Sequence, residues 1–361
     1  MTSFRTVRLL PLLLLSISIP SFSVEKPNVI IFLADDLGYG DVGFHGSDIQ
    51  TPNIDRLARE GSQLEDFYSC PVCTPTRAGL MTGRYPIRYG LMRAVIPPQR
   101  NYGLDTSEET MADVFAKAGY QHRGIFGKWH LGHWRKRWLP TSRGFTQFIG
   151  HHNGAIDYFT HIRNGEPDWH RDHRPFVQDG YATDLTGQEA RAFIEGIPKN
   201  EPYFLYVPFN APHSPLQAKE SDLAKYPHRE GRPRIHAAMV DSMDQAIGTI
   251  LEAAEQRGDL DDTFVLFFSD NGGVNNVASN GELKGAKASV YQGGIRVAAA
   301  AMWKNGGIVG GKRIRERMGY IDILPTVRSI IGVTDSPKNP LDGIDVLDAM
   351  RGRTKLEDRH W

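Results

Sequence analysis

The strongest constraint on the fold is a set of apolar, β-branched runs that are followed directly by polar residues. The first, Asn28–Leu33 (NVIIFL), shows no alternation of apolar and polar positions. A continuous run of this kind is typical of a strand that is covered on both faces. Similar runs occupy Tyr120–Phe126, Tyr203–Val207, Thr263–Phe268 and Ala298–Trp303. We expect these segments to form the strands of one buried sheet.

Helical patterns separate the predicted strands. Thr106 and Glu109 have the spacing of a capping box ahead of an apolar stripe that ends at Gly119. A second, longer stripe of apolar residues at helical spacing ends before Gly258. Because strands alternate with helices, the sequence predicts an α/β fold with a doubly wound, mainly parallel sheet. The expected helices cover residues 51–58, 111–118, 235–254 and 321–331.

Polar side chains follow four of the predicted strands. Binding sites in parallel sheets form beyond the carboxyl ends of the strands, so we expect these side chains to converge. Adjacent carboxylates after a buried strand are costly unless hydrogen bonds or a cation hold them, and oxygen ligands suit Ca²⁺ or Mg²⁺. Taken singly, each group could also be a solvated turn. The residues are Asp35 and Asp36, Lys128 and His130, His213, and Asp270 and Asn271.

A cysteine, two hydroxyls, a proline and an arginine form the run Cys73–Arg77 (CTPTR). The apolar residues that follow, Ala78–Thr82, predict the first turns of a buried helix. A nucleophile at Cys73 would then lie at a helix N-terminus, where free N–H groups favour negative charge. The alternative is a structural, buried cysteine. A disulfide between Cys73 and Cys70, the only other cysteine, would remove the nucleophile. A zinc site would need a second pair of cysteines, and a C-x-x-C redox motif would need a helix directly after it without the Thr-Pro-Thr-Arg residues.

The Cys73–Arg77 run resembles the signature of the sulfatase family, and further motifs match that family in the same order along the chain. The resemblance extends from Lys26 to about Asp345. It implies an alkaline-phosphatase-like fold and hydrolysis of sulfate monoesters. The other matching motifs are Asp35-Asp36, GKWHLG at 127–132, Ala-Pro-His-x-Pro at 211–215, Ser-Asp-Asn-Gly-Gly at 269–273, and Gly-x-Lys and Gly-Gly-x-Arg within 282–296.

The resemblance also implies a site chemistry. Cys73 would be oxidised to formylglycine by a formylglycine-generating maturation enzyme, and the hydrated aldehyde would be the nucleophile. Arg77 would steady that hydrate, and Lys128 and Lys287 would hold the sulfate oxygens. His213 would protonate the leaving oxygen and His130 would act as the base. One Ca²⁺ would be bound by Asp35, Asp36, Asp270, Asn271 and residue 73.

Residues 127–145, 153–161 and 212–217 look most like arylsulfatase B, the N-acetylgalactosamine-4-sulfatase, which favours a sulfated sugar or glycan as the substrate. Basic residues near these runs could line an anion-binding groove or lie in solvated loops. Gln292 stands where the family usually has Glu. The sequence after the last predicted strand is short, so we expect the small C-terminal antiparallel subdomain of the family to be mostly absent. The basic residues are His122, Arg123, His133, Arg135, Lys136, Arg137, His170, Arg171, His173 and Arg174.

Residues 1–23 have the basic, apolar and small-residue regions of a signal peptide, which leaves 24–361 as the catalytic domain. No later stretch is long and apolar enough to span a membrane. The chain has 42 basic and 42 acidic residues, a balance that does not indicate nucleic-acid binding. Since no N-x-S/T sequon is present, export to a bacterial periplasm or medium is a simpler reading than lysosomal delivery.

Two alternatives to a sulfatase remain open from the sequence. A phosphodiester or phosphonate hydrolase could use the same scaffold and the same cationic residues. An inactive protein that binds sulfated glycans is suggested by Gln292 and the short C-terminal segment, although the complete set of metal-type and cationic residues argues against it.

Overall fold

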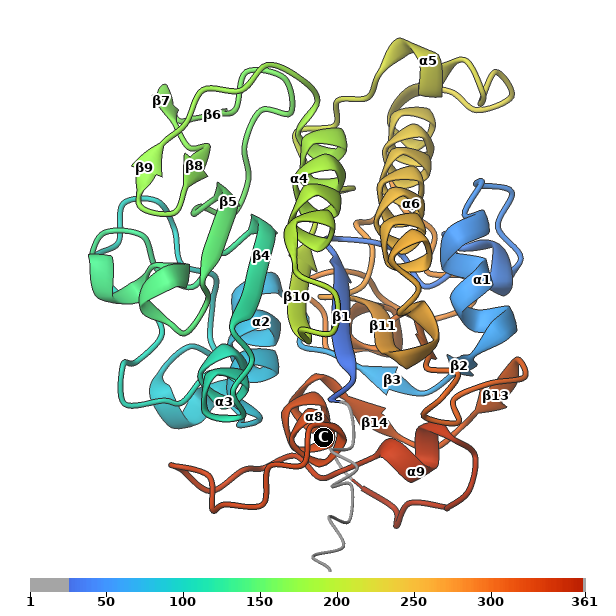
Figure 1. The fold of residues 1–361 in the computed structure, drawn as a ribbon. Helices are drawn as coiled ribbons and strands as arrows, with labels where there is room; N and C mark the ends of the chain where they lie inside the picture. The colour runs from blue at the N-terminus through green and yellow to red at the C-terminus, as the bar shows by residue number, and fades with distance from the viewer. Residues whose placement is uncertain (1–25, 360–361) are drawn as a thin grey trace, which may run out of the picture.

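The computed structural model of the chain describes residues 26–359, so the predicted signal peptide at 1–23 lies outside the described residues. A ten-stranded mixed sheet forms the centre, in the order β13-β2-β12-β11-β1-β10-β4-β5-β8-β9 (Figure 1). Its strands are β1 Asn28–Ala34, β2 Ser62–Leu64, β4 His122–Lys128, β5 Gln147–His151, β8 His170–Arg171, β9 Arg174–Pro175, β10 Tyr203–Pro208, β11 Thr263–Ser269, β12 Ala299–Met302 and β13 Lys312–Ile314.

Two small two-stranded sheets accompany the main sheet. β3 (Phe67–Tyr68) pairs in parallel with β14 (Met318–Gly319), and β6 (Ile162–Arg163) pairs antiparallel with β7 (Glu166–Pro167). The helices are α1 Pro52–Glu60, α2 Cys73–Thr82, α3 Met111–Lys117, α4 Ala182–Gly196, α5 Glu220–Leu223, α6 Gly231–Arg257, α7 Gln292–Ile295, α8 Ile323–Ile330 and α9 Leu347–Met350. None of the helices between residues 26 and 359 is both long and apolar enough to cross a membrane.

The middle of the sheet is parallel, as predicted. β1 pairs in parallel with both β10 and β11, and β4 pairs in parallel with β10 and β5. Antiparallel strands flank this centre: β12 lies on β11, and β8 lies on β5. The parallel strands therefore direct their carboxyl ends to one edge of the sheet, which is where the sequence predicted a site.

β1 shows why the sheet is covered on both faces. All seven of its residues are buried. Val29, Ile31 and Leu33 belong to a core shared with α2, α3 and α8, whereas Ile30 and Phe32 belong to a core shared with α1, α4 and α6. Because successive side chains of a strand point to opposite faces, one apolar run builds both cores. Figure 1 shows α4 and α6 side by side across one of these faces.

Several predicted boundaries are wrong. The capping box of α3 is formed by Thr110 and Asp113, not by Thr106 and Glu109. The Thr110 hydroxyl accepts a hydrogen bond from the Asp113 N–H at 3.2 Å, and Thr110 has the extended backbone of an N-cap. Glu109 instead pairs with Lys117 at the other end of the helix.

Other elements differ in extent or were not predicted. β4 begins two residues later than expected, at His122, and α6 begins four residues earlier, at Gly231. The sequence pattern did not predict α4, β5 or the short hairpin of β8 and β9, because none of them carries a long apolar run. The described residues after α8 contain α9 and no strand.

Candidate active site

Cys73 is the first residue of α2 and is buried, as are all ten residues of that helix. The hydroxyls that follow it anchor the helix to neighbouring strands. Thr74 donates to the His130 carbonyl at 3.2 Å, and Thr76 donates to the Asp270 carbonyl at 2.6 Å. Cys70 and Cys73 are both free, so no disulfide blocks Cys73. The predicted position of Cys73 at a buried helix N-terminus is confirmed.

Arg77, one turn further along α2, joins three strand ends. Its guanidinium donates to the Asp270 carboxylate from Nε at 3.1 Å and from Nη2 at 2.9 Å. Nη2 also lies 3.4 Å from the Asp35 carboxylate, and Nη1 donates to the Lys128 carbonyl at 3.0 Å. These side chains are essentially fully buried. Arg77 therefore ties α2 to the ends of β1, β4 and β11.

The two aspartates after β1 turn to different cations. Asp35 pairs with Lys128, and both side chains are fully buried. Asp36 has a positive φ of 67° and accepts hydrogen bonds from the Lys287 ammonium at 2.6 Å and the Asn271 amide at 2.8 Å. The Nε2 atom of His213 lies 3.6 Å from the Asp36 carboxylate. Lys287 and His213 keep 20% and 16% of their side chains exposed, so a ligand would approach from their side.

Two groups of side chains are arranged so that they could hold a metal ion. Ligand atoms of Asp35, Cys73 and Asp270 lie within 4.8 Å of one another, as do those of Asp35, Asp36 and His213. Asp35 Oδ1 and Asn271 Oδ1 are buried and have no hydrogen-bond partner in the protein. Unpaired buried oxygens beside clustered carboxylates have the chemistry of a hard-cation site.

The pKa values of Asp35 and Asp270 are shifted in opposite directions. Burial acts to raise the pKa of Asp35, but the charges of Lys128, His213 and Arg77 lower it well below its usual range. Burial, followed by the negative charge of Asp35, raises the pKa of Asp270 to about 7 despite its contact with Arg77. A divalent cation would supply the positive charge that keeps both groups ionised.

The hydrogen bonds of His130 define which ring nitrogen is basic. Its Nε2 lies 3.0 Å from the Ile96 carbonyl, which can only accept, so Nε2 carries the proton. Nδ1 is buried without a partner. Burial, together with the charges of Lys128 and Arg77, lowers the pKa of His130 well below 6.5. His130 is therefore a neutral imidazole with a free nitrogen that can accept a proton.

His213 has the opposite arrangement. Its Nδ1 donates to the Ser214 carbonyl at 2.6 Å, which leaves Nε2 directed at Asp36. Burial lowers the pKa of His213, whereas the charges of Asp35 and Asp36 act to raise it. A proton on Nε2 would thus be shared with Asp36 and available to a ligand beside it.

The residues to which the resemblance assigned a catalytic or metal-binding role come together at this edge of the sheet. The sequence analysis missed His151, the last residue of β5, which pairs in register with Lys128. His151 is buried, and its Nε2 has no partner. Burial and the charges of Lys128 and Arg77 lower its pKa well below 6.5. A strand prediction for 147–151 would have placed it at the site.

Of the basic residues that could line a groove or lie in solvated loops, His122 and Arg123 do not border the site, because both lie at the amino end of β4. His122 pairs with Glu201, and Arg123 donates to the Gly144 carbonyl at 2.7 Å.

Gln292 accepts a hydrogen bond from the Tyr68 hydroxyl at 3.1 Å, a role that a carboxylate oxygen would also fill.

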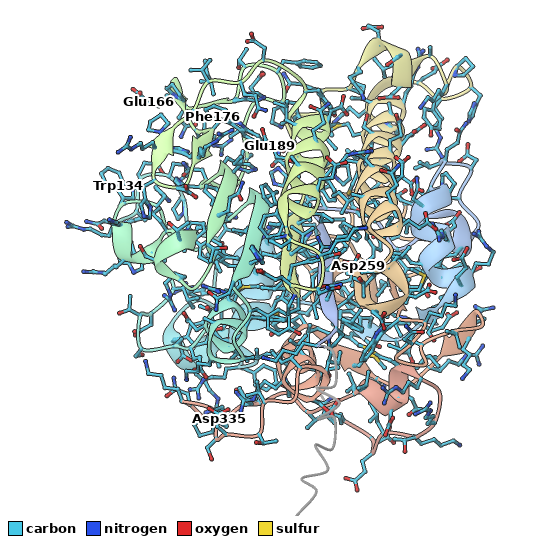
Figure 2. The ribbon with its side chains drawn as sticks, viewed as in Figure 1. Trp134, Glu166, Phe176, Glu189, Asp259 and Asp335 are labelled. Atoms are coloured by element: carbon cyan, nitrogen blue, oxygen red, sulfur yellow. The ribbon has the colours of Figure 1, made fainter. Side chains whose placement is uncertain are left out.

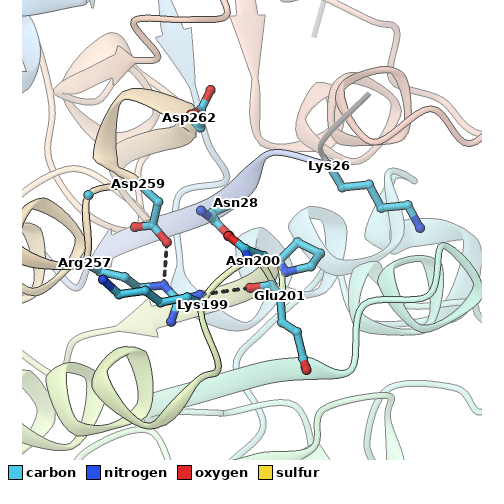
Figure 3. Close-up of a pocket in the computed structure, with 10 residues that line it drawn as sticks. Lys26, Asn28, Lys199, Asn200, Glu201, Arg257, Asp259 and Asp262 are labelled. Carbon is cyan, nitrogen blue, oxygen red and sulfur yellow. Dashed lines mark hydrogen bonds and ion pairs between the residues drawn. The ribbon is translucent and has the colours of Figure 1, made fainter. Parts of the chain in front are cut away.

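A separate polar hollow of about 400 Å³ opens at the amino ends of the strands (Figure 3). It lies near the starts of β1, β10 and β11, at the edge opposite Cys73. In Figure 3 the Arg257 side chain points to Asp259, while Lys26 points away from the other charged groups. Its lining residues include Lys26, Asn28, Lys199, Glu201, Arg257, Asp259 and Asp262.

The chain matches the family model described as Sulfatase over residues 27–333 and therefore belongs to the sulfatase family. It is 34% identical to Arylsulfatase J of Mus musculus, covering 90% of this chain and 56% of that protein. It is 33% identical to N-acetylgalactosamine-6-sulfatase of Homo sapiens, covering 93% and 67%. The chain thus spans between about half and two thirds of these relatives' lengths. They do not test the predicted likeness to arylsulfatase B, which stays a prediction.

Solved structures agree with the predicted fold class. The crystal structure of Ps i-CgsB in complex with k-i-k-neocarrahexaose superposes with a TM-score of 0.86 at 33% identity, covering 91% of this chain and 77% of that one. The PsFucS1 sulfatase from Pseudoalteromonas sp. superposes with a TM-score of 0.79 at 26% identity, covering 92% and 74%. The alkaline-phosphatase-like architecture, with its mainly parallel sheet between helix layers, is therefore confirmed.

Proposed function

We propose that this chain hydrolyses sulfate monoesters, with a sulfated sugar or glycan as the substrate. The observation that carries the proposal is the buried convergence of Asp35, Asp36 and Asp270 beside Cys73 at the start of α2. Membership of the sulfatase family supports the reaction. The names of relatives such as N-acetylgalactosamine-6-sulfatase support a sugar substrate.

We assign one Ca²⁺ to the carboxylate cluster. The donor set fits this ion, because it consists of oxygens and because Asp35 Oδ1 and Asn271 Oδ1 are buried without partners. When bound, the ion would polarise the sulfate and lower the pKa of the attacking hydroxyl. The residues that would hold it are Asp35, Asp36, Asp270, Asn271 and residue 73.

Residue 73 needs modification to serve as the nucleophile. Burial is the largest effect on the Cys73 thiol and raises its pKa to about 11, so an unmodified side chain would be protonated at neutral pH. Conversion to formylglycine by a maturation enzyme would supply a hydrated aldehyde hydroxyl at this position. The free N–H groups at the start of α2 and the nearby Arg77 would favour negative charge there.

The remaining residues divide into those that hold the sulfate and those that move protons. Lys287 borders the exposed side of the site and would bind the sulfate oxygens, with Lys128 beneath it. His213, whose side chain is 16% exposed, would donate a proton from Nε2 to the leaving oxygen. His130 would accept a proton at Nδ1, its free ring nitrogen.

Localisation and extent follow the same proposal. We infer that residues 1–23 direct export to the periplasm or medium and that 24–361 form the catalytic domain.

The test combines mass spectrometry with an assay of released sulfate. Protein from a host with the maturation enzyme should carry formylglycine in the peptide containing residue 73 and should release sulfate from N-acetylgalactosamine sulfates. Cys73→Ala should lower the rate by at least about 10³-fold. Cys70→Ala is the matched control, because Cys70 contacts Tyr320 rather than the carboxylates, and it should stay active. Undiminished release by Cys73→Ala, or faster release of phosphate from phosphodiesters, would contradict the proposal.

A further inference from the structure

A second cluster of metal-type ligands lies outside the site described above. His152 follows β5, Asp168 lies between β7 and β8, and His170 opens β8. Ligand atoms of the three residues lie within 4.8 Å of one another. His152 and Asp168 are only 5% and 4% exposed. Figure 2 labels Glu166 and Phe176, which bracket this hairpin at the left of the molecule.

Backbone hydrogen bonds hold the carboxylate of this cluster, whereas no hydrogen bond engages His170 Nδ1, which lies 3.5 Å from Asp168 Oδ1. Asp168 accepts hydrogen bonds from the backbone N–H groups of His152 at 3.1 Å and Asn153 at 2.9 Å. His152 Nε2 is buried and has no partner. The centroid of the His152 ring lies 5.0 Å from that of Phe148, on which it stacks, and 4.2 Å from that of His170. A buried, unpartnered ring nitrogen in such a setting calls for a ligand.

We propose that His152, Asp168 and His170 form a second metal site, which takes a transition metal such as Zn²⁺ rather than Ca²⁺. Two imidazoles and one carboxylate are a ligand set that suits Zn²⁺, whereas Ca²⁺ takes oxygen ligands. Three protein ligands leave one tetrahedral position for water. The site is separate from the carboxylate cluster at Cys73, and the proposal does not depend on the sulfatase assignment.

The spacing of the three side chains is compatible with a single ion. Their ligand atoms lie within 4.8 Å of one another. Zinc binds nitrogen and oxygen at about 2.0–2.2 Å, so the ligand atoms must draw together. His170, whose side chain is 15% exposed, has room to turn.

A metal here would fix a loop that packs on His130. The His130 N–H donates to the His152 carbonyl at 3.1 Å. At Gly154 an added Cβ would lie 2.5 Å from the Cε1 atom of His130, so the backbone of this loop touches the ring directly. Binding would join the β8–β9 hairpin to this loop and so hold His130 in place.

The probe is Zn²⁺ alone, added to chelator-treated, full-length protein in saturating Ca²⁺, with bound metal counted by equilibrium dialysis. We expect one tightly bound Zn²⁺ per chain. His152→Ala and His170→Ala should each weaken binding by at least about 10-fold. His173→Ala is the matched control: His173 lies on the same hairpin but bonds to Thr141, and its removal should leave binding unchanged.

Two further measurements separate this site from other causes of metal binding. Zn²⁺ should raise the Tm of the wild type and of His173→Ala but not of His170→Ala, whose Tm in chelator should match the wild type if it folds normally. Equal Zn²⁺ binding by the wild type and both ligand variants would overturn the proposal. So would the absence of Zn²⁺ binding by the wild type, or its loss on Asp270→Ala alone.

Discussion

The two edges of the central sheet carry the same kinds of residue in opposite settings. At the carboxyl edge, Asp35 and Lys128 are completely buried. At the amino edge, an open hollow of about 400 Å³ is lined by charged groups that include Lys199 and Glu201, both exposed (Figure 3). Figure 2 labels Asp259, just beyond α6, at this edge.

The comparison shows which feature marks a site. Asp259 at the amino edge has an oxygen without a protein partner, just as Asp35 has, so an unpaired oxygen alone is not diagnostic. Asp259 faces one cation, Arg257, and keeps 21% of its side chain exposed. Three carboxylates gather around Cys73 at the other edge, where water cannot screen them. A buried cluster of several carboxylates therefore indicates a metal site here, whereas an isolated, partly exposed ion pair does not.

Removal of the divalent ion should have the largest effect. A cation that stabilises the transition state by several kcal/mol contributes about 10³-fold or more to the rate, so chelation should abolish sulfate release and Ca²⁺ should restore it. Asp270→Ala should behave like the chelated enzyme. Asp259→Ala, the matched aspartate at the amino edge, should leave the rate and its Ca²⁺ dependence unchanged. Full activity in excess chelator would contradict the assignment.

Replacement of the buried lysine should have the next largest effect. Lys128→Ala removes a cation that pairs with Asp35 and is proposed to stabilise the sulfate. Loss of one such group typically costs about 10²–10³ in kcat. Lys199→Ala removes an exposed lysine from the hollow at the amino edge and should leave kcat unchanged. Steady-state kinetics on the two variants, with circular dichroism to check folding, would show whether burial decides the difference.

The sequence predicted the centre of the fold and the position of the carboxylates at the site for a common physical reason. A parallel strand buried on both faces has a continuous apolar run, and the polar residues after it must lie at the carboxyl edge. β1 and β11 were predicted within one residue of their ends, which placed Asp35 and Asp270 correctly. Their charges are close because β1 and β11 are adjacent parallel strands whose last residues, Ala34 and Ser269, pair in register.

The parts that escaped prediction depend on contacts between distant residues. β5 has three polar or glycine residues among five, so its hydrogen bonds to β4, not its composition, make it a strand and bring His151 to Lys128. The Thr110 cap competes with the equally plausible Thr106 cap, and tertiary contacts decide between them. Thr110 donates to the Arg143 carbonyl at 2.9 Å, a contact that no local pattern reveals.

The affinity for Ca²⁺ should depend on pH more steeply than any property of the amino edge. Burial and the charge of Asp35 raise the pKa of Asp270 to about 7 in the metal-free protein. The ion binds the carboxylate, so a proton competes with it below pH 7, and the apparent Kd should rise about 10-fold per pH unit lost there. Above pH 7 the Kd should level off. Calorimetric titrations from pH 5 to 8 would test this, and a flat profile would show that Asp270 is already ionised without the metal.

The smallest expected effect concerns Gln292, an exposed residue at the start of α7. Its amide oxygen accepts a hydrogen bond from the Tyr68 hydroxyl at 3.1 Å near the surface. Gln292→Glu preserves an acceptor and adds an exposed charge, so sulfate release should change by less than about fivefold, the equivalent of a single net hydrogen bond of about 1 kcal/mol. Gln292→Leu, which removes the acceptor at similar size, should have the larger effect of the two. A 100-fold gain in sulfate release by Gln292→Glu would mean that the glutamine itself keeps the activity low. It would then favour the alternative of a glycan-binding protein with little catalytic activity.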